Sequence, residues 1–180
     1  MAKKKKVNPH RIPLPKNAFN KDAIIEAAMK DDMTHAWLLV AEPLLEEGYD
    51  LVHLAEAVYD HMKAGGKRTY LDYHLKRAHD ILNIPLVSLE GDWVKSSVDI
   101  EAYKRRVDRA VLDNALCIVY LGLEKTVEEE VLQKVFFCAD LTRAELEHGL
   151  TSFEELRQGL LEKDSNMDII ANDLSLYRHG

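Results

Sequence analysis

The chain is poor in residues that cross-link or interrupt a fold. It holds only two cysteines, Cys117 and Cys138, and both lie in apolar stretches with helical spacing. We expect two buried, reduced thiols, because unpaired cysteine behaves as a small hydrophobic residue, and this usage excludes a disulfide-rich secreted domain. Three of the five prolines fall within the first 15 positions. Strong helix breakers are therefore rare in the rest of the chain.

Long apolar runs and the common catalytic signatures are also missing. Apolar runs such as Ala36–Ala41 are far shorter than the ~20 residues of a membrane-spanning helix. The lysine-rich start is not followed by the apolar stretch of a secretory signal, so we expect a cytoplasmic protein with no membrane contact. There is no Gly-x-Ser-x-Gly elbow and no glycine-rich phosphate loop. The sequence predicts no catalytic residue and no cofactor.

Acidic residues are absent from the first 21 positions, which carry seven of the 24 Lys and Arg residues. The formal net charge of the chain is −7, so residues 22–180 alone carry −14. Prolines favour an extended backbone over residues 1–19, which we expect to form a basic arm. The arm suits a nucleic acid or an acidic protein surface, or serves only solubility, whereas the acidic remainder repels polyanions. The candidate binding residues are Lys3, Lys4, Lys5, Lys6, Arg11 and Lys16.

Apolar residues at helical spacing predict three helices in the first half of the chain, over residues 21–41, 51–62 and 69–82. Asn20 is suited to cap the first helix, since its side chain accepts from free amides of the first turn. Pro43 is expected to kink or end that helix.

The second half of the chain also has apolar residues at helical spacing. Asp99 is expected to cap a long helix that ends near Gly122, with the pairs Glu101–Arg105 and Arg109–Asp113 on its exposed side. Three capping-box patterns then predict three short helices. The patterns are Thr126 with Glu129, Thr142 with Glu145 and Ser152 with Glu155, and the helices are 127–138, 142–148 and 153–163.

No segment alternates with the period of two that marks a half-buried strand, so we predict an all-α helical bundle. Aligning Ala36–Tyr59 with Ala115–Phe137 matches apolar positions, which is typical of two related three-helix units in tandem and also of any two helical hairpins. The expected organisation is a basic arm (1–19), a first helical unit (20–84), a linker (85–98), a second helical unit (99–163) and a polar tail (164–180).

The first half also carries a resemblance. The opening AKKKKVNPHRIP of residues 2–13, the Ala36-Trp37 helix and the turn at residues 47–50 resemble small phage- and prophage-encoded helical proteins that begin with a Lys-rich Val-Asn-Pro-x-Arg-Ile-Pro segment. The resemblance covers about half of the chain. It implies a mobile-element setting in a bacterial cytoplasm and carries over no catalytic residue.

Two metal-dependent functions match parts of the residue pattern. All-helical phosphohydrolases hold a divalent metal with an early His, a His-Asp pair and a later Asp, an order that His61, His79-Asp80 and Asp108 match. Carboxylate-bridged two-metal bundles use Glu-x-x-His pairs, which Asp50-x-x-His53 and Glu145-x-x-His148 approach. Solvated polar helix faces explain both sets better, and we predict no metal site.

The remaining candidate functions are nucleic-acid recognition and protein binding. Residues 141–146 resemble the start of a helix-turn-helix with a recognition helix over 152–160, but Glu154 and Glu155 would face phosphates. Lys104, Arg105, Arg106 and Arg109 alternate with acids, which favours a solvated ion-pair face. Aromatic residues near turns (Tyr49, Tyr59, Tyr70, Tyr73 and Trp93) are suited to anchor a partner or to complete the core.

From these observations we expect a non-enzymatic phage or prophage accessory protein that acts through protein contacts of its acidic surface, with an unknown partner. A nucleic-acid-binding regulator that uses the basic arm is the main alternative.

Overall fold

The computed structural model describes residues 21–64, 68–85 and 97–165, and in these ranges the chain forms helices and no strand. The all-α prediction is confirmed. The basic arm, most of the linker and nearly all of the polar tail lie outside the described residues. The helices are α1 (Lys21–Ala28), α2 (Asp32–Glu46), α3 (Leu51–Ala64), α4 (Arg68–Ile81), α5 (Ser97–Leu123), α6 (Glu129–Glu147) and α7 (Phe153–Lys163).

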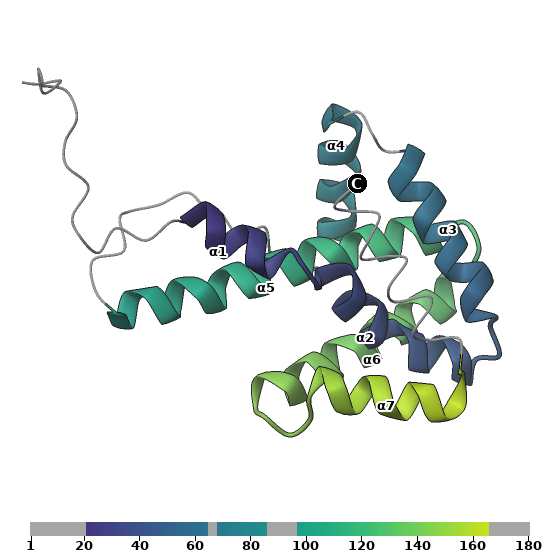
Figure 1. Ribbon diagram of the computed structural model, residues 1–180. Helices are drawn as coiled ribbons and strands as arrows, with labels where there is room; N and C mark the ends of the chain where they lie inside the picture. Colours follow the sequence, from purple (N-terminus) through teal and green to yellow (C-terminus); the bar gives the residue numbers. More distant parts are fainter. Residues whose placement is uncertain (1–20, 65–67, 86–96, 166–180) are drawn as a thin grey trace, which may run out of the picture.

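Helix α5 is the centre of the bundle. Helices α1, α2, α3 and α4 each pack against it, and α6 and α7 pack against α2 (Figure 1). The sequence of α5 explains this position, because every residue from Ala115 to Val119 is buried. A helix that is buried on all sides needs neighbours on more than one face.

Both predicted halves contribute to one apolar core. Trp37 and Leu44 of α2 are fully buried in the same cluster as Leu54 of α3, Leu123 of α5 and Leu160 of α7. Burial of such side chains stabilises the fold by roughly 1.5–3 kcal/mol each. The two halves therefore share a core, and the relation between tandem three-helix units stays a prediction.

The first half of α5 projects from this core together with α1, and we call these two segments the limb (Figure 1). The limb has its own small cluster, in which α1 covers Tyr103, Val107 and Val111 of α5. Its partly buried members from α1 and the turn that follows are Ile24, Ile25, Ala28 and Met29.

The predicted helix over residues 21–41 is wrong in two respects. It breaks at residues 29–31, because Asp31 and Asp32 begin a new helix whose side chains enter the main core while α1 follows α5. Aspartate favours helix starts over helix interiors.

Pro43 does not end the second helix, which continues to Glu46. Only the last turn loses an amide donor there, and the fully buried Leu44 offsets the cost. Asn20 lies outside the described residues.

The helices predicted over 51–62 and 69–82 are confirmed as α3 and α4. The long helix begins at Ser97 rather than at Asp99, and it ends at Leu123, next to the predicted Gly122. A Cβ at Gly122 would lie 2.6 Å from the Cα of Val58. Glycine therefore lets α3 and α5 approach closely.

One helix, α6, replaces the two predicted over 127–138 and 142–148. Thr142 lies inside it, and its N-cap is Glu128 rather than Thr126. An ion pair of Arg143 with α5 helps to hold this turn in the helix. The third capping box is confirmed, because the Ser152 hydroxyl accepts from the Glu155 amide at the start of α7.

Candidate functional site

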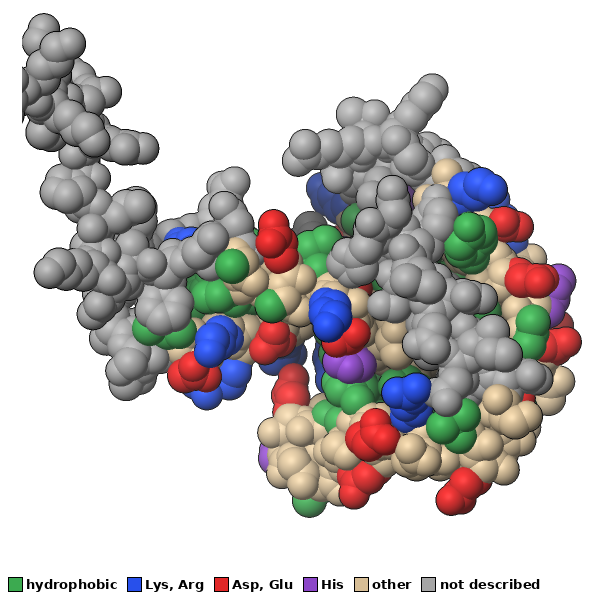
Figure 2. Space-filling model, in the orientation of Figure 1, with side chains coloured by type: hydrophobic (Ala, Val, Ile, Leu, Met, Phe, Trp, Pro, Cys, Tyr) green, Lys and Arg blue, Asp and Glu red, His purple; other side chains and the backbone are tan. Residues whose placement is uncertain are grey.

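A hollow among the described residues, which we call the notch, lies where the limb meets the other helices. Its volume is about 770 Å³, and its walls come from the α1–α2 junction, α5, the end of α6 and the start of α7. Figure 2 shows this face hollowed there, with side chains of both charges around the hollow. The ionisable residues of the lining are Asp31, Asp32, His35, Arg105, Asp108, Arg109, Arg143 and Glu147.

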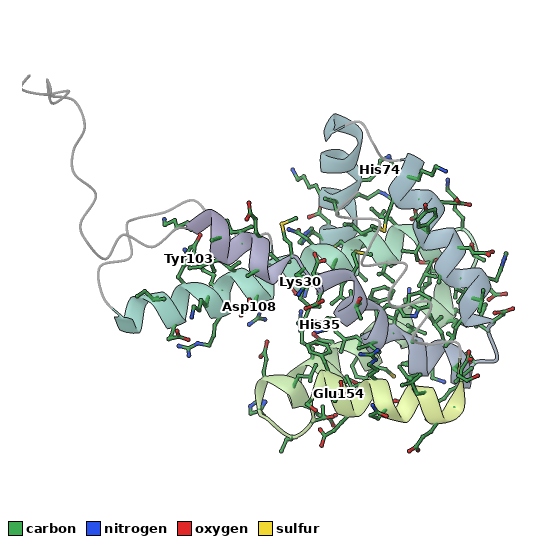
Figure 3. The ribbon with its side chains drawn as sticks, in the orientation of Figure 1. Lys30, His35, His74, Tyr103, Asp108 and Glu154 are labelled. Carbon is green, nitrogen blue, oxygen red and sulfur yellow. The ribbon has the colours of Figure 1, made fainter. Side chains whose placement is uncertain are left out.

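His35 lies on one wall of the notch. Its ring stacks on Phe153 with centroids 3.8 Å apart and an interplanar angle of 6°. Burial lowers the pKa of the imidazole, while the carboxylates of Asp31 and Asp108 act in the opposite direction. Figure 3 shows His35 on α2 beside Asp108 on α5. Because burial dominates, protonation of His35 is less favourable in the folded chain than in the unfolded chain.

A buried carboxylate, Asp113, holds α6 against α5. Its side chain is 1% exposed, and its Oδ1 accepts from Arg143 at 2.5 Å. Burial raises the pKa of Asp113, whereas Arg143 and Arg109 oppose that shift. The sequence prediction that Asp113 lies on the exposed side of the helix is therefore wrong. Arg109 does approach Asp113, at 4.0 Å, and also Glu147, at 3.8 Å.

The residues of the phosphohydrolase alternative do not form a metal centre. His79 is buried, with Nδ1 at 3.1 Å from the Ile84 carbonyl oxygen and Nε2 at 2.9 Å from the Asn114 side-chain oxygen. Both ring nitrogens thus have protein partners, while Asp80 is exposed. Within the described ranges, no group of three or more His, Cys, Asp or Glu side chains is arranged to hold a metal ion.

The residues of the two-metal alternative have local roles. Asp50 caps α3, because its Oδ1 accepts from the amides of Val52 and His53 at 2.9 and 3.4 Å. The Nδ1 atom of His148 lies 2.7 Å from the Ala144 carbonyl oxygen, at the end of α6. One residue of each pair, Asp50 and His148, thus contacts backbone groups at a helix terminus.

Another hollow, which we call the apolar groove after its exposed apolar side chains, is lined by residues 81–85 and by side chains of α5 and α6. Its volume is about 490 Å³. Ile81 on one side is 51% exposed and Phe137 on the other is 66% exposed. Leu141, 53% exposed, lies one turn after Phe137 on α6. The apolar lining comprises Ile81, Leu82, Ile84, Pro85, Leu116, Tyr120, Leu132, Phe136, Phe137 and Ala139.

Sequence reasoning missed this groove. Phe136 and Phe137 are adjacent in the chain, and only the packing of α6 shows that Phe136 is buried while Phe137 is exposed. A signal was present, since Phe137 and Leu141 at i and i+4 continue an apolar face that the predicted helix break near residue 140 interrupted. Recognition of α6 as one helix would have exposed the pattern.

The binding residues predicted from the sequence, Lys3 to Lys6, Arg11 and Lys16, lie outside the described residues. The basic cluster of α5 is a mixed ion-pair face, as predicted: Lys104 pairs with Glu101, and Arg106 lies 5.4 Å from the ring centroid of Tyr103. Arg105 lines the notch.

Among the aromatic anchors predicted near turns, Tyr49 is half-buried and donates a hydrogen bond to Glu128, and Tyr59 is 36% exposed. The side chains of Tyr70, Tyr73 and Trp93 lie outside the described residues. In the helix-turn-helix candidate, α7 packs against α2, and its Glu154 and Glu155 are exposed. That exposed acidic surface disfavours contact with a phosphate backbone.

The two cysteines are free thiols. Cys117 is buried, and burial raises its pKa to about 12, so it is an inert core residue as predicted. Cys138 is only half-buried on α6. In the described part of the chain, no helix combines the length and the apolar character that crossing a membrane requires.

Comparisons with known proteins add no family assignment. No protein-family model matches the chain, and neither a curated protein nor a solved structure is significantly similar to it.

Proposed function

We propose that this protein is a non-enzymatic adaptor or regulator that binds another protein through the apolar groove. The observation that supports the proposal is that Ile81 and Phe137, each more than half exposed, line one groove, with the exposed Leu141 one turn after Phe137 on α6. Single exposed apolar residues are common on protein surfaces, but a contiguous apolar set with an aromatic anchor is typical of an interaction site. The notch is the weaker candidate because the larger apolar side chains of its lining, Leu112, Leu146 and Phe153, are half-buried rather than exposed.

The test is a comparison of tagged full-length chains in a bacterial lysate. The double variant Phe137→Ala with Leu141→Ala removes the two exposed apolar side chains from α6. Alanine is a good helix former, so the helix itself should persist. Leu150→Ala is the matched control, because Leu150 is 76% exposed and lies after α6, away from the groove. We expect a protein that is retained by the natural chain and by the control and lost from the double variant. Equal retention by all three chains would refute the groove as the binding surface.

Nucleic-acid binding by the basic arm is the second candidate, favoured by the seven cations and the absence of acids in residues 1–21. It predicts a gel shift of mixed DNA or RNA that weakens steeply between about 50 and 200 mM salt and disappears when residues 1–19 are removed. A shift that survives this truncation would exclude the arm as its source.

The bacterial mobile-element setting that the N-terminal resemblance implies stays a prediction. For this reason the binding experiment should first use lysate from a bacterium that carries such an element.

A further inference from the structure

We infer that the occupant of the apolar groove is an amphipathic helix of the partner protein with basic residues along the edges of its apolar face. The inference rests on the proposed function and specifies the partner's chemistry. Phe137 and Leu141 form a ridge one turn long on α6, and Ile81 lies on the opposite side of the groove. Ridges and grooves of this spacing are matched by another helix, whose anchors recur at i, i+3, i+4 and i+7.

The charges around the groove determine which helix fits. Two arginines line it, Arg109 and Arg143, and both already face Asp113. Arg143 also pairs with Asp140, and Arg109 approaches Glu147. Two guanidinium groups thus face three carboxylates.

Glu129 adds a further exposed acid to the lining. An incoming acidic group would therefore meet arginines that already pair with carboxylates of the chain. An incoming Lys or Arg would find exposed carboxylates at the edge.

The net charge of the chain beyond its basic N-terminus also favours a basic partner. Residues 22–180 carry a formal net charge of −14, which attracts a cationic partner and accelerates its association at low salt. A second copy of the chain would present the same acidic surface and the same groove to the first. Like charge thus disfavours self-association through this face, and a basic helix of a different protein is the occupant that the charges favour.

The probes are synthetic amphipathic helices of about 18 residues, long enough to be helical when bound. One carries leucines at i, i+3, i+4 and i+7 with lysines on both edges, and the second replaces these lysines with glutamates. The third scrambles the basic sequence. Fluorescence anisotropy with the full chain at low salt should show at least tenfold tighter binding of the basic helix than of the acidic or the scrambled peptide. The preference for the basic over the acidic helix should shrink as salt rises, because salt screens exposed charges.

The variants locate the binding. Phe137→Ala with Leu141→Ala should weaken binding of the basic helix at least tenfold, and Leu150→Ala should leave it unchanged. Equal binding of the basic and acidic helices, or of the basic and scrambled peptides, would overturn the inference. So would a basic-helix affinity that the double variant does not change, because the peptide would then bind the acidic surface nonspecifically.

Other occupants give distinct results. A dimer in sedimentation equilibrium that the double variant abolishes would assign the groove to a second copy and overturn the inference. Tighter peptide binding after removal of residues 1–19 would assign it to the chain's own basic arm and overturn it as well. If the lysate partner depends on the groove but no basic helix binds, the proposed function stands and only its chemistry fails. If neither the lysate partner nor the basic helix depends on the groove for binding, the proposed function and this inference are both wrong.

Discussion

The limb and the rest of the bundle are stabilised very differently. The limb depends on one helix pair, in which α1 covers three buried side chains of α5. The rest, which we call the body, comprises helices α2, α3, α4, α6 and α7 and the second half of α5, and most of them share one large core. Free energies of local opening follow the amount of buried apolar contact. The limb should therefore open at a lower free energy than the body, although α5 runs through both.

The largest difference should come from removing one core side chain in each region. Trp37→Ala in the body deletes a fully buried indole and should lower the free energy of unfolding by about 3–5 kcal/mol. Val107→Ala in the limb removes two methyl groups from a fully buried position and should cost about 1–2 kcal/mol. Urea unfolding at neutral pH measures both values.

Amide hydrogen exchange then shows which helices are destabilised by each substitution. Val107→Ala should accelerate exchange in α1 far more than in α3, because α1 packs against the limb part of α5. Trp37→Ala should accelerate exchange in both. If Val107→Ala accelerates α1 and α3 equally, the limb is not a separate unit of stability.

The next effect concerns the ion pair that joins α6 to α5 where limb and body meet. Arg143→Met leaves the buried Asp113 carboxylate with only the more distant Arg109, and breaking a buried pair on one side costs about 3 kcal/mol or somewhat more. Arg109→Met is the matched control, since Arg109 is half exposed and 4.0 Å from Asp113, and it should cost at most about 1 kcal/mol.

Denaturant midpoints at about pH 7 and about pH 5 check the cause. Burial raises the pKa of Asp113, and loss of Arg143 should raise it further, so the deficit of Arg143→Met should shrink as pH falls and the carboxyl becomes protonated. A deficit that is the same at both values would mean that the arginine acts through packing rather than charge.

How much the sequence could predict depends on whether a signal is local. The helical class, α3, α4 and the Ser152 cap follow from periodicity and turn chemistry, which neighbouring residues determine. The break before Asp32 and the continuity of α6 through Thr142 depend on contacts with α5 that are remote in sequence. The groove was missed for the same reason, because Ile81 and Phe137 come to line one hollow only after folding.

Close helix packing in the body gives a third comparison. Gly122→Ala places a Cβ 2.6 Å from the Val58 backbone and should destabilise the protein by about 1–3 kcal/mol, because neither helix can withdraw freely. Gly159→Ala in α7 has no atom within 4 Å of its Cβ and should stabilise by about 0.5–1 kcal/mol through helix propensity. Thermal unfolding followed by circular dichroism measures both. Destabilisation by both substitutions would indicate that the effect at Gly122 is not specific to the α3–α5 contact.

The smallest effect should be the pH dependence across the notch. Burial holds the pKa of His35 below its usual 6.5, so the unfolded chain binds the proton more readily than the folded one. Stability from this group is therefore complete above about pH 6.5 and is lost as pH falls through that value toward the folded pKa.

His35→Gln should reduce the loss of unfolding free energy between about pH 7.5 and about pH 5.5, a window above the usual carboxylate range. Some slope should remain, because burial lowers the pKa of His61 in the same direction. The slopes of the two chains are compared rather than their absolute stabilities, because the substitution also removes the stacking on Phe153. A slope unchanged by His35→Gln would show that the carboxylates of Asp31 and Asp108 cancel the effect of burial, so that acid would not weaken this junction between limb and body.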